Sequence, residues 1–167
     1  SGYSPLEARE YVRRNHTVLG SVLVAGGEAD AMICGLLGRY QRHLRHVEEV
    51  IGTAPGVDKL SSMNGVVIGD SILFIADTYV QVDPTAEDLV EITRLASEQV
   101  RHFGIEPKVA LLSHSNFGSH ESPSARKMAR AVELVRDRLP DLEVEGEMHA
   151  DLAMVETIRN QRFPQSR

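Results

Sequence analysis

The chain has 167 residues, of which 42% are hydrophobic and 25% charged, so it is long enough to bury the core of a globular domain. Its 24 acidic residues outnumber its 18 basic ones and give a net charge of −6, which disfavours non-specific binding to nucleic acid or an anionic membrane. The single cysteine, Cys34, excludes an internal disulfide framework, and the most apolar stretch, residues 18–25, is too short to span a membrane. Together these properties predict a cytoplasmic protein.

The first quarter of the chain predicts a helix followed by a strand. Ser4 with Glu7 three residues later has the spacing of a capping box, and Pro5 suits the first helical position. This helix is expected to break near residues 15–17 and to stop at residues 26–27, where two glycines follow each other. Residues 29–34 are apolar and predict a short strand in which Cys34 packs as a small buried side chain.

A second helix is predicted after Gly38, because apolar residues recur there on one helical face and the pattern ends at Gly52. The apolar positions are Tyr40, Leu44, Val47 and Ile51. Residues 54–56 read Ala-Pro-Gly and predict a turn.

The central part predicts a hairpin and then a long helix. Residues 65–68 and 72–76 are short apolar runs on either side of a Gly-Asp turn signal. Thr85, followed three residues later by Asp88, begins the next helix, which ends at Gly104. Its predicted buried stripe consists of Leu89, Ile92, Ala96, Val100 and Phe103.

The last third predicts a strand at residues 108–113, a helix from Ser122-Pro123, and a short strand at residues 142–144. The helix presents Ala125, Met128, Val132, Val135 and Leu139 on one face. Strands alternating with helices favour a layered α/β fold with a largely parallel sheet. Residues 160–167 are polar and complete no pattern, so we expect the chain to continue in a longer protein.

Residues 113–119, which we call the 113–119 loop, are a candidate anion site. The hydroxyl and amide groups come from Ser113, Ser115, Asn116 and Ser119, and Gly118 would let backbone N–H groups approach a ligand. Open α/β sheets place their ligands at the carboxyl ends of strands, which favours this interpretation. The alternative is a hydrophilic turn whose side chains satisfy their own backbone. The pattern alone does not separate the two.

The predicted helix after Gly38 carries a strongly basic side formed by Arg39, Arg42, His43, Arg45 and His46. Guanidinium groups near a helix N-terminus suit phosphate or carboxylate. The alternative, favoured by the pattern alone, is a solvated face whose charge Glu48 and Glu49 offset.

Two other kinds of site are not expected. His114, His120 and His149 match no metal-binding spacing, so we predict no metal site. Ser113 and Ser115 lie beside His114, but neighbours on a strand point to opposite faces and no Gly-x-Ser-x-Gly elbow is present.

Four blocks resemble, in order and spacing, consecutive blocks of the phosphate acetyl/butyryltransferase family. They are GEADAMICG (27–35), IGTAPGV (51–57), DPTAEDL (83–89) and VALLSHSNFGS (109–119). The residues of these blocks are most similar to the phosphotransacetylase-like C-terminal domain of bacterial NADP-dependent malic enzymes. The resemblance implies that residues 1–167 are the central part of such a domain, truncated at both ends. It also implies a three-layer α/β/α sandwich like that of isocitrate and isopropylmalate dehydrogenases.

On this resemblance, Ser113, Ser115, Asn116, Gly118, Ser119, Arg45 and Arg39 are the candidate ligands of an acyl-CoA or phosphate group. The loop matches the family pattern except that Asn116 replaces the usual Thr and His114 the usual aromatic residue. Gly38-Arg39-Tyr40 departs further, because the family usually has small hydroxyl residues there. The family's Ser-Arg pair and Asp have no counterpart before Arg167, so we expect no catalytic residue in this chain.

The resemblance implies a regulatory and oligomerisation domain that senses acetyl-CoA within an NADP-dependent malic enzyme, an oxidoreductase that decarboxylates malate to pyruvate. NADP and a divalent metal would then belong only to the catalytic part of the parent chain, and the protein would form at least a dimer. One alternative is an active phosphate acetyltransferase, which converts acetyl-CoA and phosphate to acetyl phosphate and CoA. Another is a purely structural dimerisation module.

Overall fold

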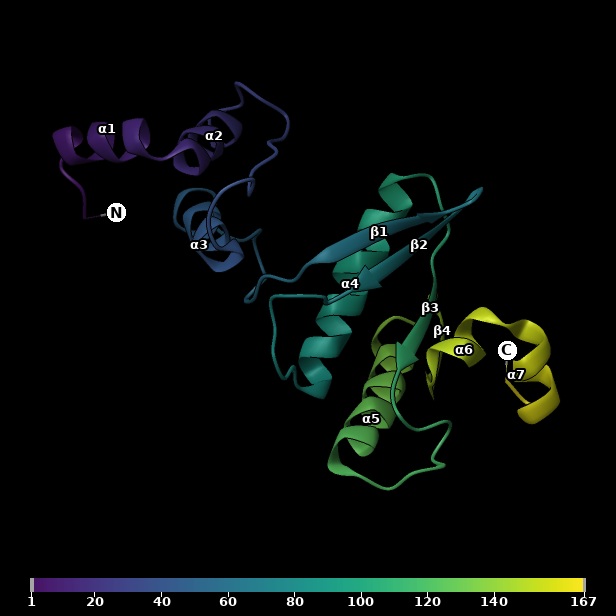
Figure 1. The fold of residues 1–167 in the computed structure, drawn as a ribbon. Helices are drawn as coiled ribbons and strands as arrows, with labels where there is room; N and C mark the ends of the chain where they lie inside the picture. Colours follow the sequence, from purple (N-terminus) through teal and green to yellow (C-terminus); the bar gives the residue numbers. More distant parts are fainter. Residues whose placement is uncertain (1, 167) are drawn as a thin grey trace. The chain divides into compact units, whose positions relative to one another are not determined.

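The computed structural model describes residues 2–166 and shows a mixed α/β chain (Figure 1). The chain divides into two compact units, one ending at Leu60 and the other beginning at Ser61. In the described residues the first unit holds helices only, and the second holds both helices and strands. The predicted α/β class is confirmed.

Helices α1 (Pro5–Arg14), α2 (His16–Ala25) and α3 (Tyr40–Val50) form the first unit. The predicted capping box is present: the Glu7 amide donates to the Ser4 hydroxyl, and the Ser4 amide donates to the Glu7 carboxylate at 2.8 Å. The predicted break is also confirmed, because Asn15 takes extended backbone angles between α1 and α2. Gly26 ends α2.

The strand predicted at residues 29–34 is wrong. These residues form an extended connection between α2 and α3 without strand pairing. The Ile33 side chain is fully exposed and Cys34 is exposed as well, so the prediction of a buried cysteine is also wrong. The physical reason is that an apolar run becomes a strand only beside a partner, and the described residues of this unit contain no strand.

Helix α3 has the predicted location but not the predicted buried face. Its buried residue is His46, 7% exposed, whereas Tyr40 and Ile51 remain more than 40% exposed. Helix α3 packs on α2, and Thr17, Val18 and Ser21 are the buried residues of α2. The centre of this small unit is therefore partly polar.

The second unit begins with the predicted hairpin. Strands β1 (Met63–Ile68) and β2 (Ser71–Ala76) pair antiparallel, with Ile68 opposite Ser71 across the Gly69-Asp70 turn. Gly69 has a φ of 58°, a left-handed value that glycine adopts without a steric penalty. Helix α4 (Ala86–His102) contacts β2 and begins at the predicted capping box of Thr85 and Asp88. Phe103, predicted as the end of its buried stripe, is largely exposed.

Strand β3 (Lys108–Leu112), helix α5 (Pro123–Arg138) and strand β4 (Glu143–Met148) form a parallel βαβ arrangement. Helix α5 packs on both strands and on α4. The main core lies between these elements and includes Val90 of α4, Leu111 of β3, Val135 of α5 and Val144 of β4. Strand β4 is longer than predicted because its second half pairs with the end of β3.

The sheet arrangement differs from the expected single, largely parallel sheet. Within residues 2–166, β1 and β2 form one two-stranded sheet and β3 and β4 form another. Helices α6 (Ala150–Met154) and α7 (Glu156–Arg162) follow β4, and α7 extends into residues 160–167, which complete no pattern in the sequence. Phe163, at the end of α7, packs against Phe117 with ring centroids 4.9 Å apart. Across residues 2–166, no helix is both long and apolar enough to cross a membrane.

Candidate functional site

The 113–119 loop begins where β3 ends and leads to α5. Since β3 and β4 are parallel, their carboxyl ends lie at the same edge, and the loop meets the end of β4 there. The pairing register shifts at this edge: Leu111 is opposite Gly146 and Leu112 is opposite Met148, so Glu147 is an extra residue on β4. A bulge of this kind re-aims the side chain that it carries.

The Glu147 side chain points into the 113–119 loop. Its Oε1 accepts a hydrogen bond from the Ser115 hydroxyl at 2.8 Å and another from the Gly118 amide at 2.7 Å. Glu147 is 3% exposed and Ser115 is 0% exposed. A carboxylate can be buried only when such donors surround it, so the loop and the glutamate form one structure.

Other hydrogen bonds close the loop on itself and on β4. The Phe117 amide donates to the Glu147 carbonyl, and the Ser113 amide donates to the Met148 carbonyl. The Asn116 amide donates to the Ser119 hydroxyl, and Asn116 Oδ1 accepts from the His149 amide at 2.7 Å. Gly118, predicted to let backbone N–H groups approach a ligand, donates its own amide to Glu147. Ser119 is exposed and Ser113 is half-buried, which leaves these hydroxyls at the surface.

A second acidic residue organises the segment after β2. Asp77 accepts hydrogen bonds from the Ser62 hydroxyl at 2.5 Å, the Ser62 amide at 2.9 Å and the Gln81 amide at 2.6 Å. Partial burial alone would raise the pKa of Asp77. The hydrogen bonds from Ser62, Gln81 and Val80 outweigh that effect, and the pKa lies below its ordinary value of 3.8. Asp77 therefore holds residues 77–81 in one conformation as a carboxylate.

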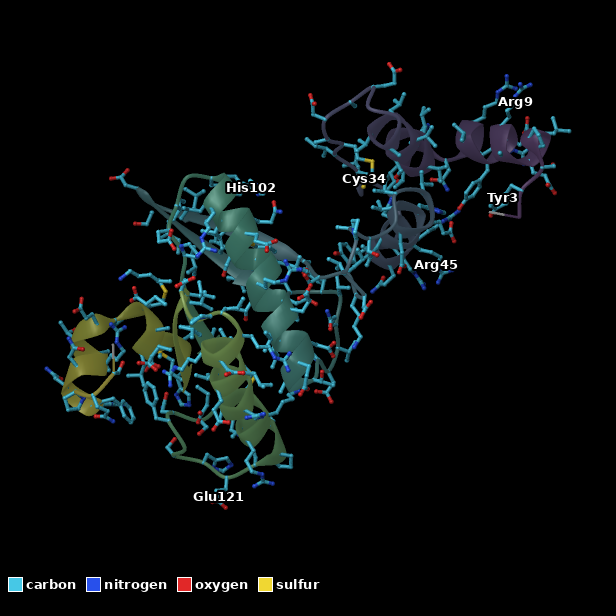
Figure 2. The ribbon with its side chains drawn as sticks, turned by 180° about the vertical axis from the view of Figure 1, so that it is seen from behind. Tyr3, Arg9, Cys34, Arg45, His102 and Glu121 are labelled. Carbon is cyan, nitrogen blue, oxygen red and sulfur yellow. The ribbon has the colours of Figure 1, made fainter. Side chains whose placement is uncertain are left out.

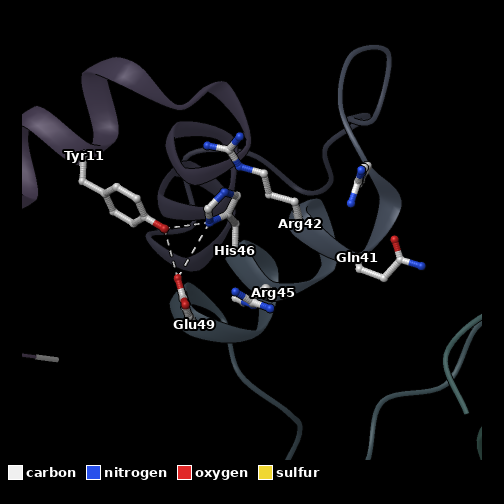
Figure 3. Close-up of a pocket in the computed structure, with 7 residues that line it drawn as sticks. Tyr11, Gln41, Arg42, Arg45, His46 and Glu49 are labelled. Carbon is white, nitrogen blue, oxygen red and sulfur yellow. Dashed lines mark hydrogen bonds and ion pairs between the residues drawn. The ribbon is translucent and has the colours of Figure 1, made fainter.

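In the first unit, residues of α3, its N-cap Arg39 and Tyr11 of α1 line an open surface hollow of about 520 Å³ (Figure 3). Arg39 is the N-cap of α3, and Arg42 and Arg45 follow on the helix. The three exposed guanidinium groups line this hollow and make no ion pair or hydrogen bond within residues 2–166. Figure 2 shows Arg45 on α3 and Cys34 on the segment before it.

The opposite side of the hollow is a hydrogen-bonded chain around His46. Asn15 Nδ2 can only donate and lies 2.9 Å from His46 Nε2, so that nitrogen accepts and Nδ1 carries the proton. His46 Nδ1 then donates to the Tyr11 hydroxyl at 2.7 Å, and this hydroxyl donates to Glu49 at 3.0 Å. Desolvation, followed by the hydrogen bond to Glu49 and its charge, raises the pKa of Tyr11, which keeps the phenol a donor.

The residues that line the hollow carry more positive than negative charge. The one carboxylate among them, that of Glu49, already accepts a hydrogen bond from the Tyr11 hydroxyl. Three arginines against this one glutamate leave a formal charge of +2 on the residues that line the hollow. Cations that lack a protein partner are the groups that anionic ligands use, and a guanidinium can hold a phosphate or carboxylate through two parallel bonds.

The structure thus places the predicted residues in two groups. Arg39 and Arg45 line the hollow of the first unit, and Ser113, Ser115, Asn116, Gly118 and Ser119 form the loop of the second. Sequence analysis missed Glu147, Asp77, Tyr11 and Asn15. For Glu147, the available signal was a glycine followed by an acidic residue at the end of a predicted strand. Within residues 2–166, no three His, Cys, Asp or Glu side chains gather as a metal site.

Comparison with known proteins gives the same family from sequence and structure. The chain is 52% identical to an NADP-dependent malic enzyme of Escherichia coli over 99% of its own length, but it spans only 22% of that relative. It is 48% identical to an NAD-dependent malic enzyme of Rhizobium meliloti over 99% of the chain and 21% of that relative. A solved phosphotransacetylase from Streptococcus pyogenes superposes with a TM-score of 0.82 at 31% identity, covering 99% of this chain and 51% of that one.

The sequence matches the phosphate acetyl/butaryl transferase family over residues 1–167. The residues of this match include the loop at the end of β3 and the arginines of α3, so both candidate groups lie inside it. The chain belongs to the phosphate acetyl/butaryl transferase family and forms a phosphotransacetylase-like domain of the kind found within malic enzymes.

Proposed function

We propose that this domain binds acetyl-CoA and thereby regulates an NADP-dependent malic enzyme to which it is joined. The observation that carries the proposal is the hollow lined by Arg39, Arg42 and Arg45, whose guanidinium groups have no protein partner in the described residues. Acetyl-CoA carries several phosphate groups, and guanidinium groups bind phosphate through paired, charge-assisted hydrogen bonds. In the second unit, the candidate ligand groups of this proposal are the hydroxyls of Ser113 and Ser119 and the side chain of Asn116 in the 113–119 loop.

The parent protein in this proposal is a cytoplasmic malic enzyme that oxidatively decarboxylates malate to pyruvate. Support comes from the two malic enzymes described above, which share about half of the aligned residues with this chain. The chain spans roughly one fifth of the length of each. NADP and the divalent metal would be bound by the catalytic part, outside this chain. The E. coli relative is named NADP-dependent and the R. meliloti relative NAD-dependent, so the choice of NADP follows the former.

The complete domain in this proposal is a three-layer α/β/α sandwich of the dehydrogenase type that forms at least a dimer. The parallel β3–α5–β4 arrangement supports this, since such units build a sandwich of that kind. The S. pyogenes phosphotransacetylase, which is about twice as long as this chain, offers the remaining length that further strands and a third layer would need.

The alternative function is a working phosphate acetyltransferase. It is less well supported, because the resemblance implies small hydroxyl residues at the positions of Arg39 and Tyr40. Bulky side chains in a substrate site displace the reacting groups, and a misplaced substrate loses most of the benefit of proximity. A purely structural module is a further alternative, which predicts no ligand at all.

Two assays on the full-length protein distinguish these functions. The first measures malate-dependent NADPH formation with and without acetyl-CoA, and the second measures phosphate-dependent acetyl transfer from acetyl-CoA. The proposal predicts an altered first rate and negligible transfer. Any such effect requires that acetyl-CoA binds two states of the protein with different affinities. An unchanged first rate with rapid transfer would establish the acetyltransferase instead, and no response in either assay would leave the structural module.

A further inference from the structure

We infer that Glu147 is the positioning residue of the 113–119 loop: its buried carboxylate fixes the conformation in which the loop meets a ligand. Neither the family match nor the sequence pattern assigns a role to this residue. The importance of this conformation for acetyl-CoA rests on the proposed function, whereas the hold of Glu147 on the loop does not.

The position of Glu147 depends on the bulge at the end of β4. Gly146 has a φ of 138°, and a Cβ atom on it would lie 2.8 Å from the carbonyl oxygen of Leu111. Only glycine fits this conformation beside β3, and the extra residue that follows is Glu147. The bulge therefore directs a charged side chain into the interior at the edge where the loop begins.

The carboxylate holds the loop at Ser115 and Gly118. Ser115 Oγ donates to Glu147 Oε1 and accepts from the His120 amide at 3.2 Å, which ties the residue after the loop to Ser115. The Gly118 amide reaches the same oxygen, and Gly118 follows Phe117, whose φ of 48° is unusual for a residue with a side chain. One oxygen atom thus stabilises a turn that the backbone adopts with difficulty.

The other contacts of the loop would survive the loss of this side chain. The Phe117 amide and the Ser113 amide bind backbone carbonyls of β4, and Phe117 packs on Phe163. Without the carboxylate the loop should therefore stay attached to β4 while its inner turn, residues 115–120, loses its common acceptor. The hydroxyls of Ser113 and Ser119 would then no longer be held in one arrangement toward a ligand.

The test compares variants of Glu147 in the full-length protein by hydrogen–deuterium exchange of peptides that cover residues 113–122. Glu147→Gln keeps an acceptor oxygen at the same reach, and we expect exchange close to that of the unmodified protein. Glu147→Asp withdraws the carboxylate by one methylene, and Glu147→Leu removes it. We expect these two to speed exchange of the inner turn about 5- to 150-fold, because the Ser115 hydroxyl and the Gly118 amide lose their acceptor. Glu143→Gln, on the exposed part of the same strand, is the matched control.

Peptides from α4, residues 86–102, report whether each variant is folded, so a misfolded Glu147→Leu protein leaves the Glu147→Asp result to decide. Unchanged exchange of residues 115–120 in a folded Glu147→Asp protein would overturn the inference. So would the same rise in Glu147→Gln as in Glu147→Leu, because the acceptor oxygen would then be irrelevant.

A second measurement, the dissociation constant of acetyl-CoA from the same proteins, separates a positioning role from a merely structural one. We expect Glu147→Asp to weaken binding and Glu147→Gln to restore most of it. Val135→Ala, which lowers stability through the core, should leave the affinity unchanged. Equal affinity in Glu147→Asp and the unmodified protein would overturn the positioning role. Absence of binding by the unmodified protein would instead refute the proposed function, and the exchange data would still judge the hold of Glu147 on the loop.

Discussion

Ser115 Oγ donates a 2.8 Å hydrogen bond to Oε1 of Glu147, and both residues are buried at the carboxyl edge of β3 and β4. The two residues are 32 positions apart in sequence. A serine that the sequence pattern suggested for a ligand is thus already paired with an internal anion. The groups left for a ligand are the hydroxyls of Ser113 and Ser119 and the side chain of Asn116.

Replacing Ser115 by Ala should lower the free energy of unfolding by about 1–3 kcal/mol, since the buried Glu147 loses a donor and the His120 amide loses an acceptor. Urea unfolding followed by far-ultraviolet circular dichroism measures this loss. Ser124→Ala is the control, because Ser124 is exposed in the first turn of α5. Equal stability of the two variants would show that the buried pair contributes nothing.

Replacing Gly146 by Ala should destabilise the protein by about 1–3 kcal/mol or more, because φ is 138° and the new Cβ atom would lie 2.8 Å from the Leu111 carbonyl. Gly65→Ala is the matched control, since Gly65 is also in a strand but its Cβ would meet only ordinary contacts at 3.6 Å. Thermal unfolding of both variants measures the difference. A Gly146→Ala protein as stable as Gly65→Ala would contradict the strained bulge.

The pKa of Asp77 predicts a pH dependence of stability. Because the folded protein lowers this pKa below 3.8, ionisation of Asp77 favours folding. Its contribution is fully present above about pH 5 and is lost as the pH falls through the folded pKa. Asp77→Asn should therefore cost stability at neutral pH, by about 1–3 kcal/mol, and progressively less below about pH 4.

Urea unfolding at several pH values from neutral to acid tests this prediction, with Asp70→Asn in the exposed hairpin turn as the control. A difference between Asp77→Asn and the unmodified protein that stays constant with pH would show that the hydrogen bonds of Asp77 do not depend on its charge.

Replacing Arg45 by Ala should weaken the response to acetyl-CoA by about 1–3 kcal/mol if its guanidinium contacts a phosphate of the ligand. The measurement is the acetyl-CoA concentration that gives half of the change in malate-dependent NADPH formation by the full-length protein. Arg9→Ala is the control, because Arg9 is an exposed arginine of α1 outside the hollow. An Arg45→Ala protein that responds like the Arg9→Ala protein would show that Arg45 is a solvated surface charge without a ligand contact.

We expect the protein to self-associate at least to a dimer. Leu19, Val22 and Leu23 of α2 are each about 40% exposed in the single chain, and apolar surface of this kind favours association. Sedimentation equilibrium over a range of protein concentrations measures the mass in solution. A mass that stays monomeric at the highest concentration would contradict the prediction and remove support for the oligomerisation role.

The sequence by itself determined the features that depend on neighbours in the chain. Capping residues predicted the starts of α1, α4 and α5, because Ser4, Thr85 and Ser122 bond amides only three residues away. The Gly69-Asp70 turn predicted the hairpin for the same reason. The four blocks also sufficed to identify the family, which the full-length match confirms.

Only the tertiary structure decided what depends on partners far away in sequence. Residues 29–34 looked like a strand, yet the described residues of their unit contain no strand to pair with them, and Ile33 and Cys34 lie exposed. The burial of His46 depends on Asn15 and Tyr11, which precede it by 31 and 35 residues. Glu147 meets Ser115 because parallel pairing brings two strand ends to one edge and a bulge turns one side chain inward. Local patterns specify hydrogen bonds along the chain, whereas burial and long-range pairing arise only when separate segments pack together.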